Sequence, residues 1–300
     1  MAVGDASAQE ASGKPNFLII VTDDQGYADL RAYKHHAKDV KTPNMDRLAS
    51  RGVLFTDAYA SAPVCSPSRA GWVTGRHQVR WDPKSSFNCG LSKDDSHVAE
   101  IMKKNGYRTA RFGKNDYGGS SLHRHNVREY PLNHGFDEFL GFKHGAMDNY
   151  SHFYYYGGPD RHILRRNRES HREDGVFFPD IVTREALRFI GDNRQPPFFL
   201  YLPLNQPHYP LQPEARYLER FQDIADGARR YPSARLSSMD HHTAPVLERP
   251  SPLRLRDPPP PPVPRPPPPP GSPDPPAHPG DRSPALPAAL APRAWVLSAR

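Results

Sequence analysis

Several common features are missing from this chain of 300 residues. It has only two cysteines, Cys65 and Cys89, so no disulfide framework is expected. No apolar run is long enough to span a bilayer. Residues 1–14 form a polar leader without the apolar stretch of a secretory signal. As written, the chain therefore predicts a cytoplasmic protein without a membrane span.

Positive charge is in moderate excess, with 40 Lys and Arg against 33 Asp and Glu. Such an excess can indicate a nucleic-acid partner. However, no basic strip with interleaved aromatic residues and no zinc-ligand spacing accompanies it. The densest group, five arginines within residues 161–172, is typical of a solvated loop. No nucleic-acid partner is expected.

Proline is concentrated at the carboxyl end, where the last fifty residues hold 19 of the 36 prolines. Residues 246–300 show neither helical nor strand periodicity and predict a disordered or polyproline II tail. Two interpretations stay open. A protein that recognises polyproline can dock there, or the terminus is an out-of-frame or replaced sequence, which the composition favours. A packed domain is expected only over residues 15–245.

Within residues 15–245, predicted strands alternate with predicted helices. Strands are predicted at 16–22, 53–58, 107–112 and 198–204, and helices at 43–50, 67–74, 96–105 and 180–192. This alternation favours the α/β class, with a mostly parallel sheet flanked by helices. Functional residues gather beyond the carboxyl ends of such strands. Asp23, Asp24, Lys114 and His208 each follow a predicted strand, so we expect them to meet at one edge of the sheet.

The segment Cys65-Ser66-Pro67-Ser68-Arg69 has features of an anion-binding helix start. Ser66 can cap the helix, Pro67 fits its first turn, and Arg69 adds a fixed positive charge. An oxyanion near residue 65 would then meet free backbone N–H groups and a guanidinium. A lone cysteine before a helix is about as often a small buried hydrophobic residue. These residues alone leave both interpretations open.

Two further positions suit ionic chemistry. Asp23 and Asp24 offer paired carboxylates, which Ca²⁺ or Mg²⁺ prefer. Adjacent acidic residues after a strand are also typical of a turn. His208 lies between Pro207 and Pro210, on a loop that the prolines stiffen, and this favours a functional role.

Seven motifs, in this order, resemble those of the sulfatase family. They are NFLIIVTDDQGY (16–27), TPNMDRL (42–48), CSPSRA with TGR (65–70 and 74–76), GYRT (106–109), GK (113–114), HGFD (134–137) and PHYP (207–210). The chain is therefore identified as a member of this family from about residue 15 to about residue 240.

The resemblance implies an alkaline-phosphatase-like fold and an arylsulfatase-like sulfuric ester hydrolase. The implied substrate is a small-molecule or carbohydrate sulfate ester. In this family a formylglycine-generating enzyme oxidises the motif cysteine, here Cys65, to formylglycine. The family is commonly exported, so the resemblance implies a periplasmic or extracellular protein.

The resemblance also implies a role for each matching residue. Asp23, Asp24 and the modified residue 65 would hold calcium, with magnesium as the alternative. Arg69 would orient the formylglycine, Lys114 would hold the sulfate, and His208 would contact the sulfate or protonate the leaving group.

The sequence departs from the family pattern in two places. The family usually has Gly-Lys-x-His, whereas this chain has Asp116 in place of the histidine, where a carboxylate can act as a base. No asparagine follows Asn205 and no lysine follows Lys143. The Asp-Asn metal pair and the second sulfate lysine expected after His208 are therefore missing, and turnover by this chain would mean that other residues, such as Asp116 or Asp240, complete the site.

The calcium site is consequently expected to be half built. A formylglycine-dependent phosphoester or phosphonate hydrolase on the same fold is one alternative. An inactive fragment without the metal pair is the other.

Overall fold

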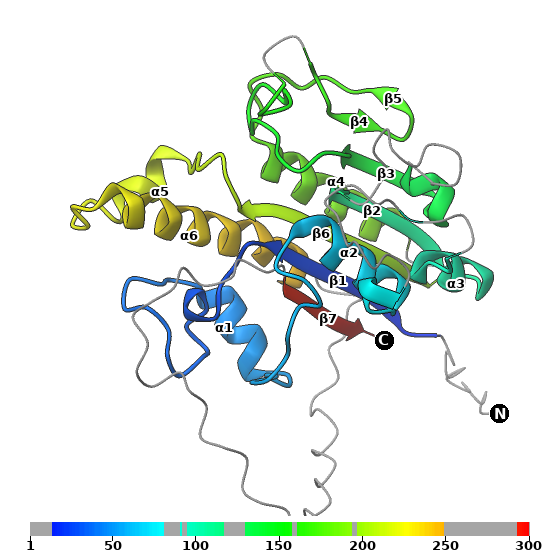
Figure 1. The fold of residues 1–300 in the computed structure, drawn as a ribbon, viewed down its shortest axis with the longest axis horizontal. Coiled ribbons are helices and arrows are strands. Elements are labelled where there is room, and N and C mark those ends of the chain that lie inside the picture. The colour runs from blue at the N-terminus through cyan, green and yellow to red at the C-terminus, as the bar shows by residue number, and fades with distance from the viewer. Residues whose placement is uncertain are drawn as a thin grey trace, which may run out of the picture.

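The computed structural model describes residues 14–80, 91, 95–116, 130–157, 161–193, 197–248 and 293–299. Their central feature is a seven-stranded sheet with the order β5-β4-β3-β2-β6-β1-β7 (Figure 1). The strands are β1 (Asn16–Asp23), β2 (Arg108–Lys114), β3 (Glu138–Phe142), β4 (Arg165–Arg166), β5 (Glu169–Ser170), β6 (Phe198–Pro207) and β7 (Arg293–Ala299). The pairings among β1, β6, β2 and β3 are parallel, and those of β4, β5 and β7 with their neighbours are antiparallel. The mostly parallel α/β fold is as expected.

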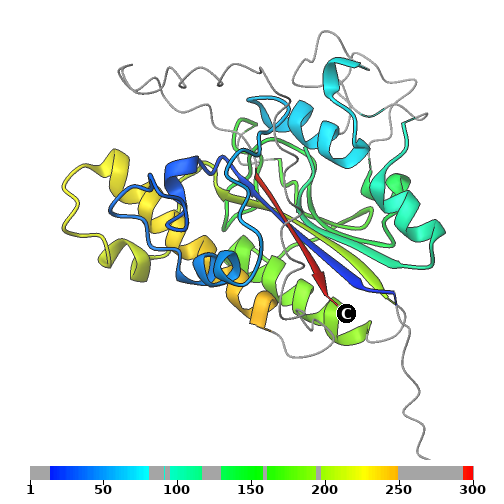
Figure 2. The same ribbon diagram turned by 90° about the horizontal axis from the view of Figure 1, so that it is seen from below.

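Helices cover both faces of the sheet. They are α1 (Pro43–Ser50), α2 (Cys65–Thr74), α3 (Val98–Lys104), α4 (Phe178–Asp192), α5 (Ala215–Glu219) and α6 (Gly227–Glu248). Figure 2 shows α2 and α3 on one face and α4 and α6 on the other. In the part of the chain that the structure describes, no helix has both the length and the apolar character needed to cross a membrane.

The continuous apolar run of β1 is explained by its burial on both faces of the sheet. Successive side chains of a strand point to opposite faces. Leu18 and Ile20 pack into the core shared with α4 and α6, whereas Ile19 and Val21 pack into the core beneath α2 and α3. A strand that is buried on both faces has no position for a polar residue until it ends.

Three local expectations need correction. Helix α2 begins at Cys65, with Val64 as its N-cap, so Ser66 lies inside the helix and does not cap it. Helix α3 is capped by His97, whose ring accepts a hydrogen bond from the Ala99 N–H, and not by Ser96. Residues 53–58 form no strand; Phe55 is 68% exposed, and the segment lies along the surface without a described strand partner.

Strand β7 was not expected, because proline dominates the composition around it. It pairs antiparallel with β1, from Asn16 opposite Ala299 to Thr22 opposite Arg293. Its sequence includes Trp295-Val296-Leu297, which has high strand propensity. Helix α6 also continues beyond residue 245, to Glu248. The predicted disorder of the Pro-rich segment, the polar leader up to residue 13 and Cys89 lie outside the described residues.

Candidate active site

Four elements bring the candidate residues together at one edge of the sheet. Asp23 ends β1, Lys114 ends β2, His208 follows the last residue of β6, and Cys65 begins α2. Because β1, β6 and β2 are parallel, their carboxyl ends share this edge. The structure therefore brings the candidate residues together at one edge of the sheet. Their chemical roles remain predictions.

Lys114 lies at the centre of this group. Its Nζ donates to Asp23 Oδ2 at 2.6 Å and to Cys65 Sγ at 3.3 Å. Arg69 approaches the same carboxylate from α2, with an Nη2 to Asp23 Oδ1 distance of 3.2 Å but without hydrogen-bond geometry. The side chains of Asp23, Arg69 and Lys114 are all fully buried. We call Asp23, Cys65, Arg69 and Lys114 the charged cluster.

The opposite charges of Asp23, Lys114 and Arg69 keep all three side chains ionised. Burial alone would raise the pKa of Asp23, but the charges of Lys114 and Arg69 outweigh it and hold the pKa well below its usual range. Burial likewise opposes the charged forms of Lys114 and Arg69, yet Asp23 raises the pKa of both. Two cations face one carboxylate within the charged cluster, and a second carboxylate, that of Asp116, lies 3.5 Å from Lys114.

Asp24 and His208 lie beside the charged cluster, with His208 Nε2 3.3 Å from Asp24 Oδ2. His208 Nδ1 lies 2.6 Å from the Tyr209 carbonyl, which can only accept, so Nδ1 carries the hydrogen and Nε2 has the lone pair in the neutral ring. Burial and then the Lys114 charge lower the pKa of His208. Burial and the Asp23 charge raise the pKa of Asp24 to about 7. Both shifts favour the neutral forms of the two side chains.

Cys65 is poorly suited to act as a thiolate. Burial, followed by the Asp23 charge, raises the pKa of its thiol to about 12. Reactive cysteines instead have a lowered pKa. The position therefore holds a protonated thiol beside a buried ammonium.

Asp116 and Asp240 take different places. Asp116 Oδ2 lies 3.5 Å from Lys114 Nζ, so this carboxylate reaches the charged cluster. Asp240, on α6, accepts from the backbone N–H groups of Asn44 and Met45 at 3.1 and 2.8 Å. It therefore caps α1, and its carboxylate is engaged there and not at the charged cluster.

Sequence reasoning missed two buried residues that support Lys114. Arg111 donates to the carbonyls of Lys114 and Asn115 at 2.7 and 2.9 Å and so fixes the turn after β2. Asn115 is fully buried, and neither of its amide atoms has a hydrogen-bond partner. The sequence offered little signal, because β2 also contains Arg108, Thr109 and Lys114. Gly113 is required here, because a Cβ at this position would lie 2.0 Å from the Pro203 carbonyl oxygen.

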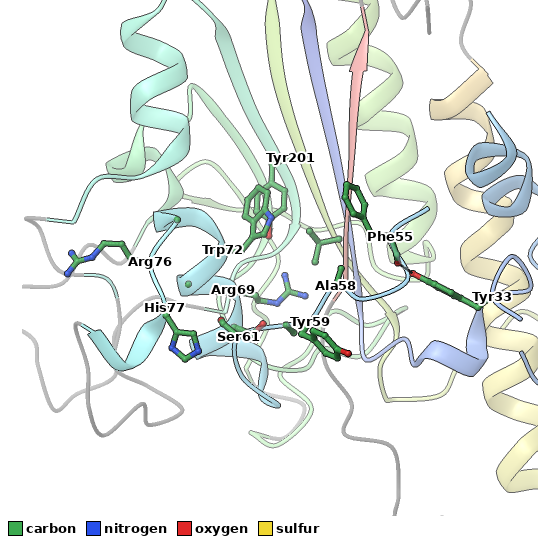
Figure 3. Close-up of a pocket in the computed structure, with 15 residues that line it drawn as sticks. Tyr33, Phe55, Ala58, Tyr59, Ser61, Arg69, Trp72, Arg76, His77 and Tyr201 are labelled. Carbon is green, nitrogen blue, oxygen red and sulfur yellow. Dashed lines mark hydrogen bonds between the residues drawn. The ribbon is translucent and has the colours of Figure 1, made fainter. Parts of the chain in front are cut away.

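An aromatic cavity of about 400 Å³ lies beside the charged cluster and runs along α2. Its aromatic lining comes from Tyr33, Phe55, Tyr59, Trp72 and Tyr201 (Figure 3). The rings of Trp72 and Tyr201 stack with their centroids 4.8 Å apart. Arg69 lines this cavity and also pairs with Asp23, whereas Cys65, Lys114 and His208 are not among the lining residues.

A second aromatic group lies next to His208. Tyr155, Tyr156 and Tyr209 are exposed and in ring contact with one another. The Tyr209 ring is 4.1 Å from the His208 ring. We call these three residues the tyrosine rim. The run of tyrosines at 154–156 was its only signal in the sequence.

Comparisons with known proteins agree over most of the chain. The family model Sulfatase matches residues 15–249. Arylsulfatase J of Mus musculus is 30% identical over 251 residues, which cover 79% of this chain and 40% of that protein. N-acetylgalactosamine-6-sulfatase of Rattus norvegicus is 30% identical over 243 residues, covering 70% of this chain and 43% of that protein.

Among solved structures, Ps i-CgsB in complex with k-i-k-neocarrahexaose is similar with a TM-score of 0.68 and 30% identity. The match covers 78% of this chain and 54% of that one. This chain thus spans less than half the length of the two curated relatives and about half that of the solved structure.

Proposed function

The chain belongs to the sulfatase family, and on this premise we propose that it carries the catalytic part of an arylsulfatase-like sulfuric ester hydrolase. The observation that carries the proposal is the contact of Lys114 with both Asp23 and Cys65 at the carboxyl edge of the sheet. A buried ammonium with a second cation nearby suits a sulfate group. A sulfate placed there would lie directly against residue 65.

We propose that Cys65 is the residue converted to formylglycine, whose hydrate supplies one hydroxyl to attack sulfur and another to expel the sulfate. The raised pKa of the Cys65 thiol, to about 12, supports a role other than that of a thiolate nucleophile. Lys114 and Arg69 would bind the sulfate oxygens, because both are buried cations whose charge is retained. Arg69 would also orient residue 65.

His208 would contact the sulfate or protonate the leaving group. Its Nε2 lies 3.3 Å from Asp24 Oδ2, and a proton on this nitrogen can pass to a departing alkoxide or phenoxide. Asp116, 3.5 Å from Lys114, is the carboxylate placed to act as a base on the other side.

The carboxylates also fit a divalent cation. Asp23 Oδ1 is buried without a hydrogen-bond donor, and the Asp23 charge helps to raise the pKa of its neighbour Asp24. A cation between them would relieve both conditions. We propose that Asp23, Asp24 and residue 65 hold Ca²⁺, or alternatively Mg²⁺, which would screen charge on the sulfate. Ca²⁺ takes six to eight oxygen ligands, so these residues fill only part of its coordination.

The substrate class we propose is a small-molecule or carbohydrate sulfate ester. The aromatic cavity and the tyrosine rim supply flat apolar surfaces on which an aryl group or a sugar ring can stack. The similar protein Ps i-CgsB was solved with a neocarrahexaose, which supports a carbohydrate.

The test begins with co-expression of the full chain and a formylglycine-generating enzyme. Peptide mass spectrometry should show the modification at Cys65 and not at Cys89. Hydrolysis of an aryl sulfate is then compared with that of the matching aryl phosphate, with Cys65→Ala as the control for both. An unmodified Cys65 peptide under conditions that mature a control sulfatase would overturn the mechanism. Faster cleavage of the phosphate would favour the phosphoester or phosphonate hydrolase instead.

A further inference from the structure

A second group of metal-ligating side chains lies outside the charged cluster. One ring nitrogen of His152, one of His162 and a carboxylate oxygen of Asp174 lie within 4.8 Å of one another. His152 is fully buried, the His162 side chain is 5% exposed, and the Asp174 side chain is 53% exposed. The two imidazole rings meet almost at right angles, with centroids 6.0 Å apart. We call these three residues the histidine cluster.

Backbone hydrogen bonds hold the three residues in place. The Ile163 N–H donates to the His152 carbonyl at 3.0 Å, next to an antiparallel bridge between Phe153 and His162. Gly175, which follows Asp174, donates to the Tyr150 carbonyl at 2.8 Å. His152 itself has a φ of +59°, a conformation that residues other than glycine rarely adopt. Such strain is often found at functional sites.

The hydrogen bonds of His152 leave one ring nitrogen available. Its Nε2 lies 3.1 Å from the Val176 carbonyl, which can only accept, so Nε2 carries the hydrogen and Nδ1 has a free lone pair. This Nδ1 is buried without a partner. A backbone carbonyl that fixes one ring nitrogen while the other is free is the usual setting of a metal-binding histidine.

His162 is in a similar position. Both of its ring nitrogens are buried without a hydrogen-bond partner, although Nε2 is 3.5 Å from Asp174 Oδ1. Burial lowers the pKa of His152 and of His162, and Arg172 lowers that of His162 further. Both shifts favour the neutral ring, which is the form that binds metals.

Asp174 supplies the negative charge. Arg172 Nη1 lies 3.2 Å from Asp174 Oδ2, so Oδ1 is the oxygen that faces the histidines. Zinc ligands lie about 2.0–2.2 Å from the ion, which places them roughly 3.5 Å apart. The exposed Asp174 side chain can make the small movement that this spacing requires.

We propose that His152, His162 and Asp174 bind one divalent transition-metal ion of the zinc class. Two imidazole nitrogens and one carboxylate oxygen suit zinc, whereas calcium prefers oxygen ligands throughout. The ion fastens the segment that carries Tyr155 and Tyr156 to the residues preceding α4. The tyrosine rim beside His208 is thereby held in place, while the ion takes no part in the chemistry at residue 65.

The experiment titrates zinc into the full chain carrying Cys65→Ser and stripped of metal with a chelator. Removing the thiol matters, because Asp23, Cys65 and His208 form another group that can hold a metal. Affinity is measured by competition with a chromophoric chelator, and binding to the fold by the shift in thermal unfolding midpoint. The expected result is one equivalent of tightly bound zinc, which excess calcium does not displace, and a raised midpoint.

Two further substitutions locate the ion. His162→Gln and Asp174→Asn, each added to Cys65→Ser, should weaken zinc binding by at least about tenfold, by comparison with the 10- to 100-fold cost of altering residues around a metal. Asp174 is exposed, so its variant stays folded even if His162→Gln does not. The matched control is His171→Gln, because His171 lies in the same loop but pairs with Glu173 at 2.6 Å; its zinc affinity should be unchanged. Equal affinity in the parent and the Asp174→Asn variant, or an equal loss in the His171→Gln variant, overturns the proposal.

Discussion

The charged cluster and the histidine cluster bury polar groups in opposite ways. In the charged cluster, Asp23 is matched by Lys114 and Arg69, and all three remain ionised. In the histidine cluster, two neutral rings keep ring nitrogens without any partner. The first arrangement balances buried charges against one another, although Asp23 Oδ1 has no hydrogen-bond donor. The second becomes complete only when a cation is added.

The largest effect we expect concerns catalysis at the charged cluster. With Cys65 matured, the chain should hydrolyse an aryl sulfate several powers of ten more slowly than a complete sulfatase. The proposed cation would have few protein ligands, and no lysine follows Lys143 to contact the sulfate. Each missing contact of this kind typically costs about 2–4 kcal/mol of transition-state stabilisation. Initial rates with equal amounts of formylglycine provide the measurement. Addition of a carboxyl-terminal part with the Asp-Asn pair should restore turnover. If the chain without this part turns over as fast as a complete sulfatase, the missing residues are not needed and the prediction is wrong.

The next prediction tests whether Lys114 stabilises the fold by pairing with the buried carboxylate of Asp23. Lys114→Met should lower the free energy of unfolding by about 3 kcal/mol, the low end for a broken buried pair, because Arg69 still faces Asp23. Urea denaturation gives this value. The control is Lys103→Met, since Lys103 pairs with Asp137 at 2.7 Å but is exposed and should cost under about 1 kcal/mol. Equal costs for the two variants would show that burial does not distinguish these pairs.

A third prediction concerns the thiol of the unmodified, metal-free chain. Because its pKa is raised to about 12, Cys65 is almost entirely protonated at pH 8, and its thiolate fraction should keep rising with pH well beyond 9. Alkylation of folded Cys65 at pH 8 should be at least about a hundredfold slower than that of a free thiol. The urea-denatured chain is the control and should react at the ordinary rate. Rapid alkylation of folded Cys65 with a plateau near pH 8 contradicts the burial argument.

The smallest effect is expected in the histidine cluster. Without zinc, Asp174→Asn should change the free energy of unfolding by no more than about 0.5 kcal/mol, because the residue is exposed and its ion pair with Arg172 is solvated. With zinc at about 100 times the dissociation constant, the parent should gain about 2.7 kcal/mol over its metal-free form. Parallel thermal melts at both zinc levels measure the difference. A gain of the same size in the variant would mean that the ion binds elsewhere.

The sequence predicts well those site residues whose positions follow from strand ends. Asp23 and Lys114 end β1 and β2, His208 follows β6, and parallel strands bring such ends together. The histidine cluster has no comparable signal. His152 and His162 lie in a stretch without periodicity, and only the bridge between Phe153 and His162 brings them close.

Long-range contacts account for most of the other differences. Asp240 looked available to the site, but it caps α1, nearly two hundred residues earlier in the chain. Strand β7 was not predicted, because prolines dominate the composition of the surrounding segment and an average over that segment does not reveal a short strand. Arg111 lies inside the buried strand β2, and only the structure reveals the carbonyls to which it donates.

The pairing of β1 also affects how the protein folds. Phe17 lies opposite Phe199 on one side and opposite Ser298 on the other, so both neighbours of β1 come from far along the chain. During synthesis β1 emerges long before either partner strand, so its apolar side chains stay exposed until β6 and β7 are made. Contacts of such high sequence separation fold slowly, and exposed strands of this kind promote aggregation. The chain is therefore expected to be most prone to aggregation before β6 and β7 have paired with β1.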